Sequence, residues 1–131
     1  MNRLPFDTYT FRKIIETKCV YVDKTDLVYK LANEVSIAFL SRPRRFGKSM
    51  LCTTLKEYFL GSKELFANLK IEKLEQNWTK YPVFSFTMSS LKDVDFELME
   101  SKLLNQIEKY EKIYSKNISK KIFSSLIYRF L

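Results

Sequence analysis

Apolar residues recur at steps of three and four along much of the chain, the spacing that places them on one face of a helix. The clearest stretch covers residues 96–114, where charged residues separate the apolar positions Phe96, Met99, Leu103, Ile107, Tyr110 and Tyr114. Similar spacing predicts shorter helical segments over residues 8–18, 23–34, 47–60, 62–69 and 118–130. Gly61 is placed to end the segment over 47–60.

Three apolar runs have the length of strands instead. Residues 19–22 are β-prone, and residues 35–41 and 81–90 are compact runs of the kind that parallel sheets bury on both faces. Helical segments separate the two longer runs, so we expect parallel strands joined by right-handed crossovers. The predicted fold class is α/β with a parallel sheet, which is incomplete at the C-terminus because only two good strands are present.

Composition favours one ordered domain. The chain has 131 residues, 46% of them hydrophobic, with only 2 Gly and 3 Pro, which suits a single core. Histidine is absent, which removes the commonest metal ligand and general base. Cys19 and Cys52 form no metal-binding pair and are expected to be buried thiols in a reducing compartment. No signal peptide or membrane span is evident, so we expect a cytoplasmic protein without a membrane partner.

The charge balance favours anionic partners. The formal net charge is +8, and the one dense basic cluster is "RPRR" at residues 42–45. Nucleotides and nucleic acids are both compatible with such a surplus, although many of the lysines are expected to form an ordinary solvated surface.

The basic cluster runs into a partial phosphate-binding motif, "SRPRRFGKSM" at residues 41–50. The Walker A pattern G-x-x-x-x-G-K-[ST] fits its last three positions, but Arg42 stands where the opening glycine belongs. The motif nevertheless lies between an apolar run and a predicted helix, where a helix N-terminus offers unpaired N–H groups to an anion. The candidate nucleotide-binding residues are Arg44, Arg45, Phe46, Gly47, Lys48, Ser49 and Met50.

Each residue of the closing triplet has an expected role. Gly47 lets the backbone approach phosphate oxygens, Lys48 reaches the β- and γ-phosphates, and the Ser49 hydroxyl contacts Mg²⁺. Arg42 and Pro43 weaken the prediction, because neither replaces a glycine where a positive φ is needed.

The motifs "YVDKTDLVYKL", "FLSRPRRFGKSMLCTTLKEYF" and "YPVFSF" together resemble the predicted AAA-ATPase-like proteins of bacteria. The resemblance implies a three-layer P-loop NTPase fold, ATP and Mg²⁺ as ligands, and often a PD-(D/E)XK nuclease-like domain further along. It also implies that the opening Walker glycine is usually absent, so Arg42 is the usual form of the loop. In the first motif, Tyr21, Asp23, Lys24 and Thr25 could lie near adenine, but helix capping by Asp23 and Thr25 explains them better.

No Walker B acid is identifiable. The acidic residues after position 82 are expected to cap or solvate helices: Asp93, Asp95, Glu97, Glu100, Glu108 and Glu111. Residues 1–131 therefore fit the N-terminal portion of an AAA-ATPase-like domain that hydrolyses little or no ATP alone, and whether the chain is an enzyme stays open. Such a portion is expected to expose apolar surface, because its later ATPase and nuclease-like segments would be missing.

Two other functions stay open. A basic module could bind nucleic acid without sequence specificity, although Phe39, Phe84 and Phe86 are expected in buried strands and not on a stacking surface. The chain could also be an inert remnant that acts only through protein contacts.

Overall fold

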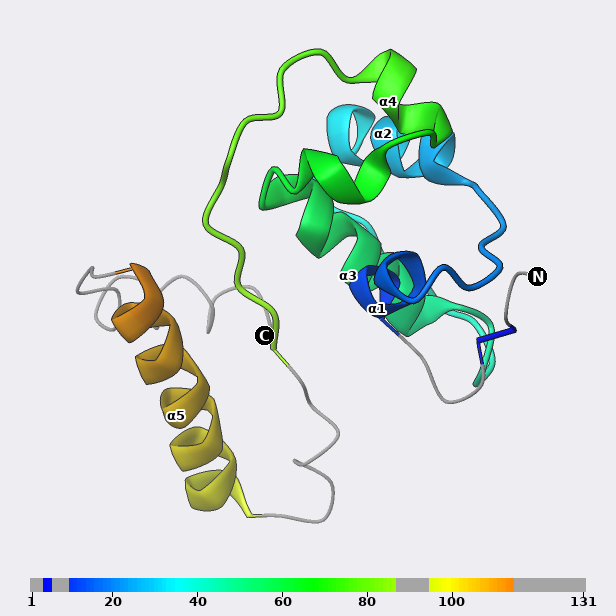
Figure 1. Ribbon diagram of the computed structural model, residues 1–131. Helices are drawn as coiled ribbons and strands as arrows, with labels where there is room; N and C mark the ends of the chain where they lie inside the picture. Colours follow the sequence, from blue (N-terminus) through cyan, green and yellow to red (C-terminus); the bar gives the residue numbers. More distant parts are fainter. Residues whose placement is uncertain (1–3, 6–9, 87–94, 115–131) are drawn as a thin grey trace. The chain divides into compact units, whose positions relative to one another are not determined.

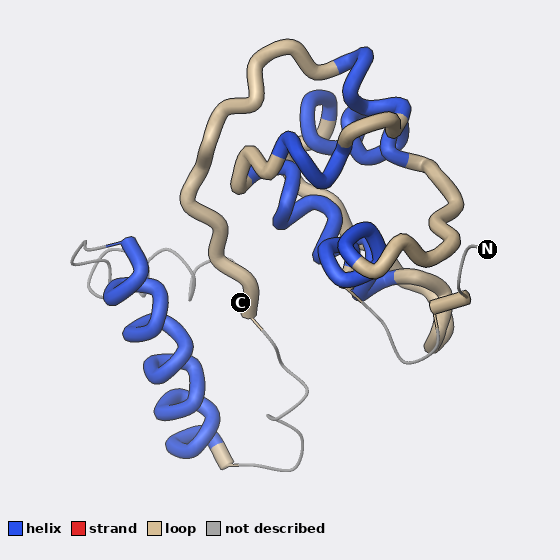
Figure 2. Tube along the Cα trace, viewed as in Figure 1, coloured by secondary structure: helices blue, strands red, loops and turns tan. Residues whose placement is uncertain are grey.

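The computed structural model describes residues 4–5, 10–86 and 95–114, which form helices and loops (Figures 1 and 2). The chain divides into two compact units, residues 1–83 and 84–131. The helical elements are α1 (Phe11–Glu16), α2 (Thr25–Glu34), α3 (Lys48–Phe59), η1 (Lys63–Phe66), α4 (Lys70–Leu74) and α5 (Phe96–Tyr114).

The predicted helices are confirmed wherever they fall on described residues. Helix α3 ends as the sequence predicts, because Gly61 adopts the left-handed conformation with φ 69°. Gly61 N–H donates to the Tyr58 carbonyl and Ser62 N–H donates to the Glu57 carbonyl, which together form a Schellman motif. Helix α1 ends in the same way at Lys18, which has φ 52° although it carries a side chain. The predicted helix over 118–130 lies outside the described residues.

The predicted sheet is wrong. None of the described residues forms a strand, so the α/β class and the three-layer P-loop NTPase fold with a parallel sheet are not observed (Figure 2). Residues 35–41 form an irregular segment in which Ile37 is 80% and Phe39 93% exposed. Residues 19–22 and 81–86 are likewise not strands, and residues 87–90 lie outside the described part of the chain.

The strand predictions are wrong for a physical reason. An apolar run becomes a strand only when another segment satisfies its backbone N–H and C=O groups. Helices satisfy their own backbone groups, so the helical predictions do not depend on a partner. Among the described residues no segment pairs with the 35–41 run, and its apolar side chains are consequently exposed.

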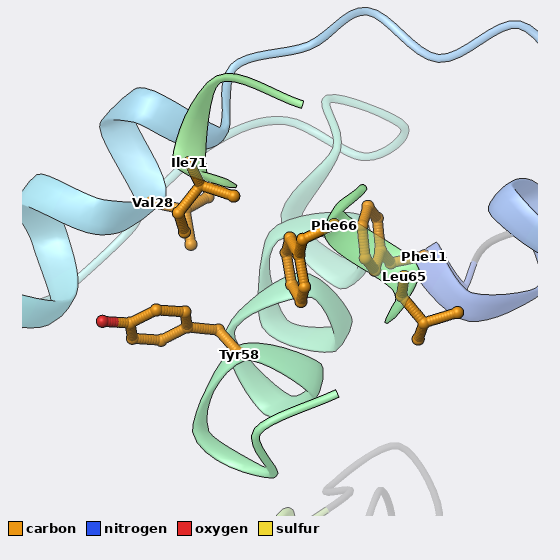
Figure 3. Close-up of a cluster of buried hydrophobic side chains, with 6 residues drawn as sticks. All are labelled: Phe11, Val28, Tyr58, Leu65, Phe66 and Ile71. Atoms are coloured by element: carbon orange, nitrogen blue, oxygen red, sulfur yellow. The ribbon is translucent and has the colours of Figure 1, made fainter. Parts of the chain in front are cut away.

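The core of the first unit joins residues from five helical elements. Phe11 of α1 and Phe66 of η1 are completely buried, and their rings stack with centroids 4.8 Å apart. Helix α1 packs against α3, and α2 packs against α4 (Figure 1). Six buried apolar side chains form one cluster (Figure 3): Phe11, Val28, Tyr58, Leu65, Phe66 and Ile71.

An ion pair between exposed Arg12 and buried Glu57 ties α1 to α3. Glu57 is 7% exposed and accepts two hydrogen bonds from Arg12, Nε at 3.0 Å and Nη2 at 2.7 Å. The Ser62 hydroxyl donates a third bond, 2.8 Å long, to the same carboxylate. Burial alone would raise the pKa of Glu57, but the bonds from Arg12 and Ser62 outweigh burial and hold this pKa below its ordinary value.

The second unit contains α5. The Asp95 carboxylate accepts a 3.0 Å hydrogen bond from Leu98 N–H, so the predicted capping role of Asp95 is confirmed. The Tyr110 hydroxyl donates to the Ser85 carbonyl at 2.7 Å, and its ring packs against Phe84. Among the described residues, no helix combines the length and apolar character required to cross a bilayer.

The cysteines differ from expectation. Both thiols are free, but Cys52 is exposed on α3 and Cys19 is only partly buried.

Candidate nucleotide-binding loop

Gly47 sets the point where the basic loop becomes a helix. It precedes the first residue of α3 and adopts a left-handed conformation, with φ 75° and ψ 13°. A Cβ atom built at Gly47 would have no neighbour within 4 Å, so the backbone on that side is open to a ligand. The positive φ favours glycine here, in agreement with the sequence analysis.

The conformation of the loop shows whether a glycine is needed at position 42, where the Walker A pattern has one and this chain has Arg42. Arg42 is not among the left-handed residues of the described chain, so its position does not require glycine. Arg45 is left-handed instead, with φ 67°, and Phe46 separates it from left-handed Gly47. Left-handed residues within a tight turn are typical of the anion-binding nests that successive backbone N–H groups form.

The first turn of α3 adds unpaired donors to this arrangement. No side chain caps the helix, and the first intrahelical bond joins Leu51 N–H to the Gly47 carbonyl at 2.9 Å. The N–H groups of Lys48, Ser49 and Met50 therefore lack intrahelical acceptors. They lie at the positive end of the helix dipole, which stabilises a bound anion.

The side chains around this helix end are mostly accessible. The Lys48 ammonium donates a hydrogen bond to the Arg42 carbonyl, which folds the lysine back over the loop. Ser49 is exposed, as are the arginines of the cluster, Arg42, Arg44 and Arg45. Phe46 is 61% exposed, whereas Met50 packs against the core. The predicted residues thus share one loop, but Met50 offers only its backbone N–H to a ligand.

The upstream motif is an internal clamp. One oxygen of the Asp23 carboxylate accepts from Thr25 N–H at 2.9 Å and from the Thr25 hydroxyl at 2.7 Å. The other oxygen accepts from Lys70 N–H at 2.8 Å, and the buried Thr25 hydroxyl accepts from Ile71 N–H at 3.1 Å. The two side chains therefore join the N-termini of α2 and α4, a wider role than capping one helix.

This clamp perturbs the carboxylate. Burial favours the protonated acid, but the hydrogen bonds from Thr25 and Lys70 outweigh burial and keep the pKa of Asp23 below its ordinary value. Tyr21 packs edge-on against Phe11 with ring centroids 5.4 Å apart, and burial raises the pKa of its phenol. Lys24 of the same motif is exposed.

The described residues contain no group of three or more acidic or thiol side chains able to hold a metal ion. Ser49, which the sequence predicts as a magnesium contact, lies in the first turn of α3. Its exposed hydroxyl in the first turn of α3 suits an ion that is also held by nucleotide phosphates. Sequence reasoning missed the left-handed Arg45, because nothing in its side chain signals that conformation.

Comparison with known proteins identifies the family. The sequence model described as Predicted AAA-ATPase matches residues 5–129, and the chain belongs to this family. Membership of an ATPase-like family agrees with nucleotide binding and implies ATP as the ligand, with Mg²⁺ as its usual counterion.

One relative is an uncharacterized protein from the vnfD 5′ region of Azotobacter chroococcum mcd 1. It is 37% identical over 104 residues, which cover 78% of this chain and 20% of the relative. The chain thus corresponds to a minor part of that longer protein. No solved structure matches the chain.

Proposed function

We propose that the chain binds Mg²⁺-ATP through the loop of residues 41–50. The observation that carries the proposal is the pair of left-handed residues, Arg45 and Gly47, directly before helix α3, which no side chain caps. Backbone N–H groups from this turn and from the first turn of the helix would cradle phosphate oxygens. The family match supports nucleotide as the anion.

The side chains complete the proposed site. Lys48 would leave the Arg42 carbonyl and contact the β- and γ-phosphates, while Ser49 would contact Mg²⁺. The bound ion would neutralise phosphate charge. The exposed guanidinium groups of Arg44 and Arg45 would raise the local positive potential, and Phe46 would lie beside the nucleotide.

Hydrolysis is proposed to require more than this chain. Phosphoryl transfer needs an acid that holds Mg²⁺ and a group that positions water. Neither is identifiable beside the loop among the residues that the structure describes, so we expect little or no turnover by residues 1–131 alone. Further polypeptide, such as later ATPase and nuclease-like segments of a longer protein, would supply these groups, in line with the length of the relative.

Calorimetric titration with Mg²⁺-ATP tests the proposal on the wild type, Lys48→Ala and Lys73→Ala. Lys73 is an exposed lysine of α4, so its variant controls for loss of one positive charge. We expect Lys48→Ala to bind at least about tenfold more weakly and Lys73→Ala to bind like the wild type, because a direct charged contact outweighs a screened one. Equal weakening of ATP binding in both variants would mean that only the net charge of the chain matters, and it would contradict the proposal.

Single-stranded nucleic acid is a second candidate ligand. The structure favours it more than the sequence did, because Phe39 is 93% and Phe46 61% exposed on either side of the arginine cluster. Exposed aromatic rings beside basic residues suit stacked bases and backbone phosphates. A steep salt dependence of oligonucleotide binding that ATP does not alter would support this candidate, whereas competition by ATP would place both ligands on one loop.

A further inference from the structure

A cavity of about 280 Å³ lies at the other end of α3 from the basic loop. Residues from the last turns of α2 and α3 and from the segment 75–81 line it. The lining includes four aromatic side chains, one amide and one carboxylate: Tyr58, Phe59, Trp78, Tyr81, Asn33 and Glu75. In Figure 3 the Tyr58 hydroxyl points away from Phe66 and out of the buried cluster.

Aromatic rings form walls of this cavity. The planes of Tyr58 and Trp78 meet at 68° with centroids 5.9 Å apart, and those of Phe59 and Tyr81 meet at 79° with centroids 6.1 Å apart. Tyr81 N–H donates to the Phe59 carbonyl at 2.8 Å, which fixes this wall. In each pair the edge of one ring meets the face of the other. Aromatic side chains that line a cavity can attract a cation through their ring faces.

The polar groups of the cavity also favour positive charge. Glu75 is the acidic side chain that lines it, and none of the described lysines or arginines does so. The carboxyl ends of α2 and α3 meet here, and each carries the negative end of a helix dipole. A negative cavity is unusual for a chain with net charge +8, so its composition does not follow from the general charge balance.

The hydrogen bonds within the cavity narrow the choice of cation. One Glu75 oxygen accepts from the Tyr58 hydroxyl, and the other accepts from Asn77 N–H at 2.9 Å. The Asn33 amide donates to the Tyr29 carbonyl at 2.9 Å. Because these polar atoms are already engaged, the cavity suits a cation that carries charge but has few N–H donors to satisfy. Burial and the bond to Glu75 raise the pKa of Tyr58 to about 12, so this phenol stays neutral.

We infer that this cavity binds a small alkylated ammonium compound, held by the aromatic faces and by the charge of Glu75. The volume is just below the usual range of ligand pockets, about 300–1,000 Å³, which restricts the ligand to a small molecule. The site is independent of the proposed nucleotide loop. Helix α3 has 12 residues, so its two ends are separated by about 16 Å at 1.5 Å per residue.

Choline is a suitable probe, and 3,3-dimethyl-1-butanol is its neutral counterpart of nearly the same shape. Trp78 is the only tryptophan, so its fluorescence reports on the cavity directly, with calorimetry as the second readout. Sodium chloride at equal ionic strength controls for salt. We expect saturable choline binding, at least about tenfold tighter than binding of the alcohol.

Variants separate the site from its surroundings. Glu75→Gln keeps the size of the side chain and should weaken choline binding at least about fivefold, because the charge is lost. Tyr81 is 54% exposed, so Tyr81→Leu removes one aromatic wall without opening the core, and about threefold weakening is expected. Glu64→Gln, an exposed position on η1, should bind choline like the wild type.

Three results would overturn the inference: no saturable choline binding by either readout, equal affinity for the alcohol, or unchanged affinity in folded Glu75→Gln and Tyr81→Leu. None of these results bears on ATP binding, because the variants and ligands differ.

Discussion

Two of the sequence motifs of this chain, YVDKT at residues 21–25 and the basic loop at residues 41–50, are built in opposite ways. Asp23 and Thr25 of the first motif are engaged within the protein, where four hydrogen bonds link them to each other and to the start of α4. The loop of residues 41–47 is exposed throughout, and the helix that follows it has no side-chain cap. One motif satisfies backbone donors, and the other leaves them unpaired.

This difference separates structural roles from ligand-binding roles. A threonine that is completely buried and saturated with hydrogen bonds has little capacity left for a ligand, which favours capping over adenine contact for the first motif. Unpaired N–H groups at a helix start are costly to bury but useful to an anion. We therefore expect mutations in the first motif to change stability, and mutations in the second to change binding.

The largest expected effect on stability is that of Asp23→Ala. The substitution leaves Thr25 N–H and Lys70 N–H without the carboxylate that accepts their hydrogen bonds. We expect the free energy of unfolding to fall by about 3 kcal/mol. Chemical denaturation measures it. Asp26→Ala is the matched control, because Asp26 makes only an exposed ion pair with Lys70, 3.6 Å long, whose loss costs about 0.5 kcal/mol. Similar losses in both variants would disprove the clamp.

Acid should weaken the first unit through the same carboxylates. The pKa values of Asp23 and Glu57 are lowered in the folded state, so the unfolded chain binds more protons as pH falls below about 4.5. Stability is thus fully present above that pH and declines as the pH passes through the folded pKa values. Urea titrations at several pH values measure the slope, which should be smaller in Glu57→Gln. An identical slope in that variant would contradict the role of Glu57.

In the second motif we expect a smaller change in the free energy of unfolding, and this change is an increase. Arg45 carries a side chain at φ 67°, so Arg45→Gly should relieve strain and raise the free energy of unfolding by about 0.5–1 kcal/mol. Arg44→Gly is the control, because Arg44 is not left-handed and glycine there only increases the entropy of the unfolded chain. Destabilisation by both substitutions would show that Arg45 is not strained.

Local signals explain what the sequence predicted correctly. Helices α2, α3 and α5 follow from periodic apolar residues, and the end of α3 follows from Gly61, because both features act within a few residues. The apolar run over 35–41 has no such local solution. Its conformation depends on a pairing partner elsewhere, and composition alone does not reveal whether one exists.

The candidate site was predictable to the same degree. Gly47, Lys48 and Ser49 lie at a helix start, as the motif requires. Gly47 ends the loop and α3 begins after it, although no strand precedes the loop among the described residues. The link from Asp23 to Lys70 joins residues far apart in the sequence, so no local pattern encodes it. The aromatic cavity is likewise assembled from three separate segments, and the spacing of apolar residues predicted only that Tyr58 and Phe59 lie in a helix.

Thermal unfolding with and without Mg²⁺-ATP, on the wild type, Asp23→Ala and Lys48→Ala, tests this division of roles most directly. A ligand that binds the folded state raises Tm by mass action. We expect ATP to raise the Tm of the wild type and of the destabilised Asp23→Ala variant, and to raise that of Lys48→Ala clearly less. An undiminished ATP shift in Lys48→Ala, or the loss of that shift in folded Asp23→Ala alone, would contradict it.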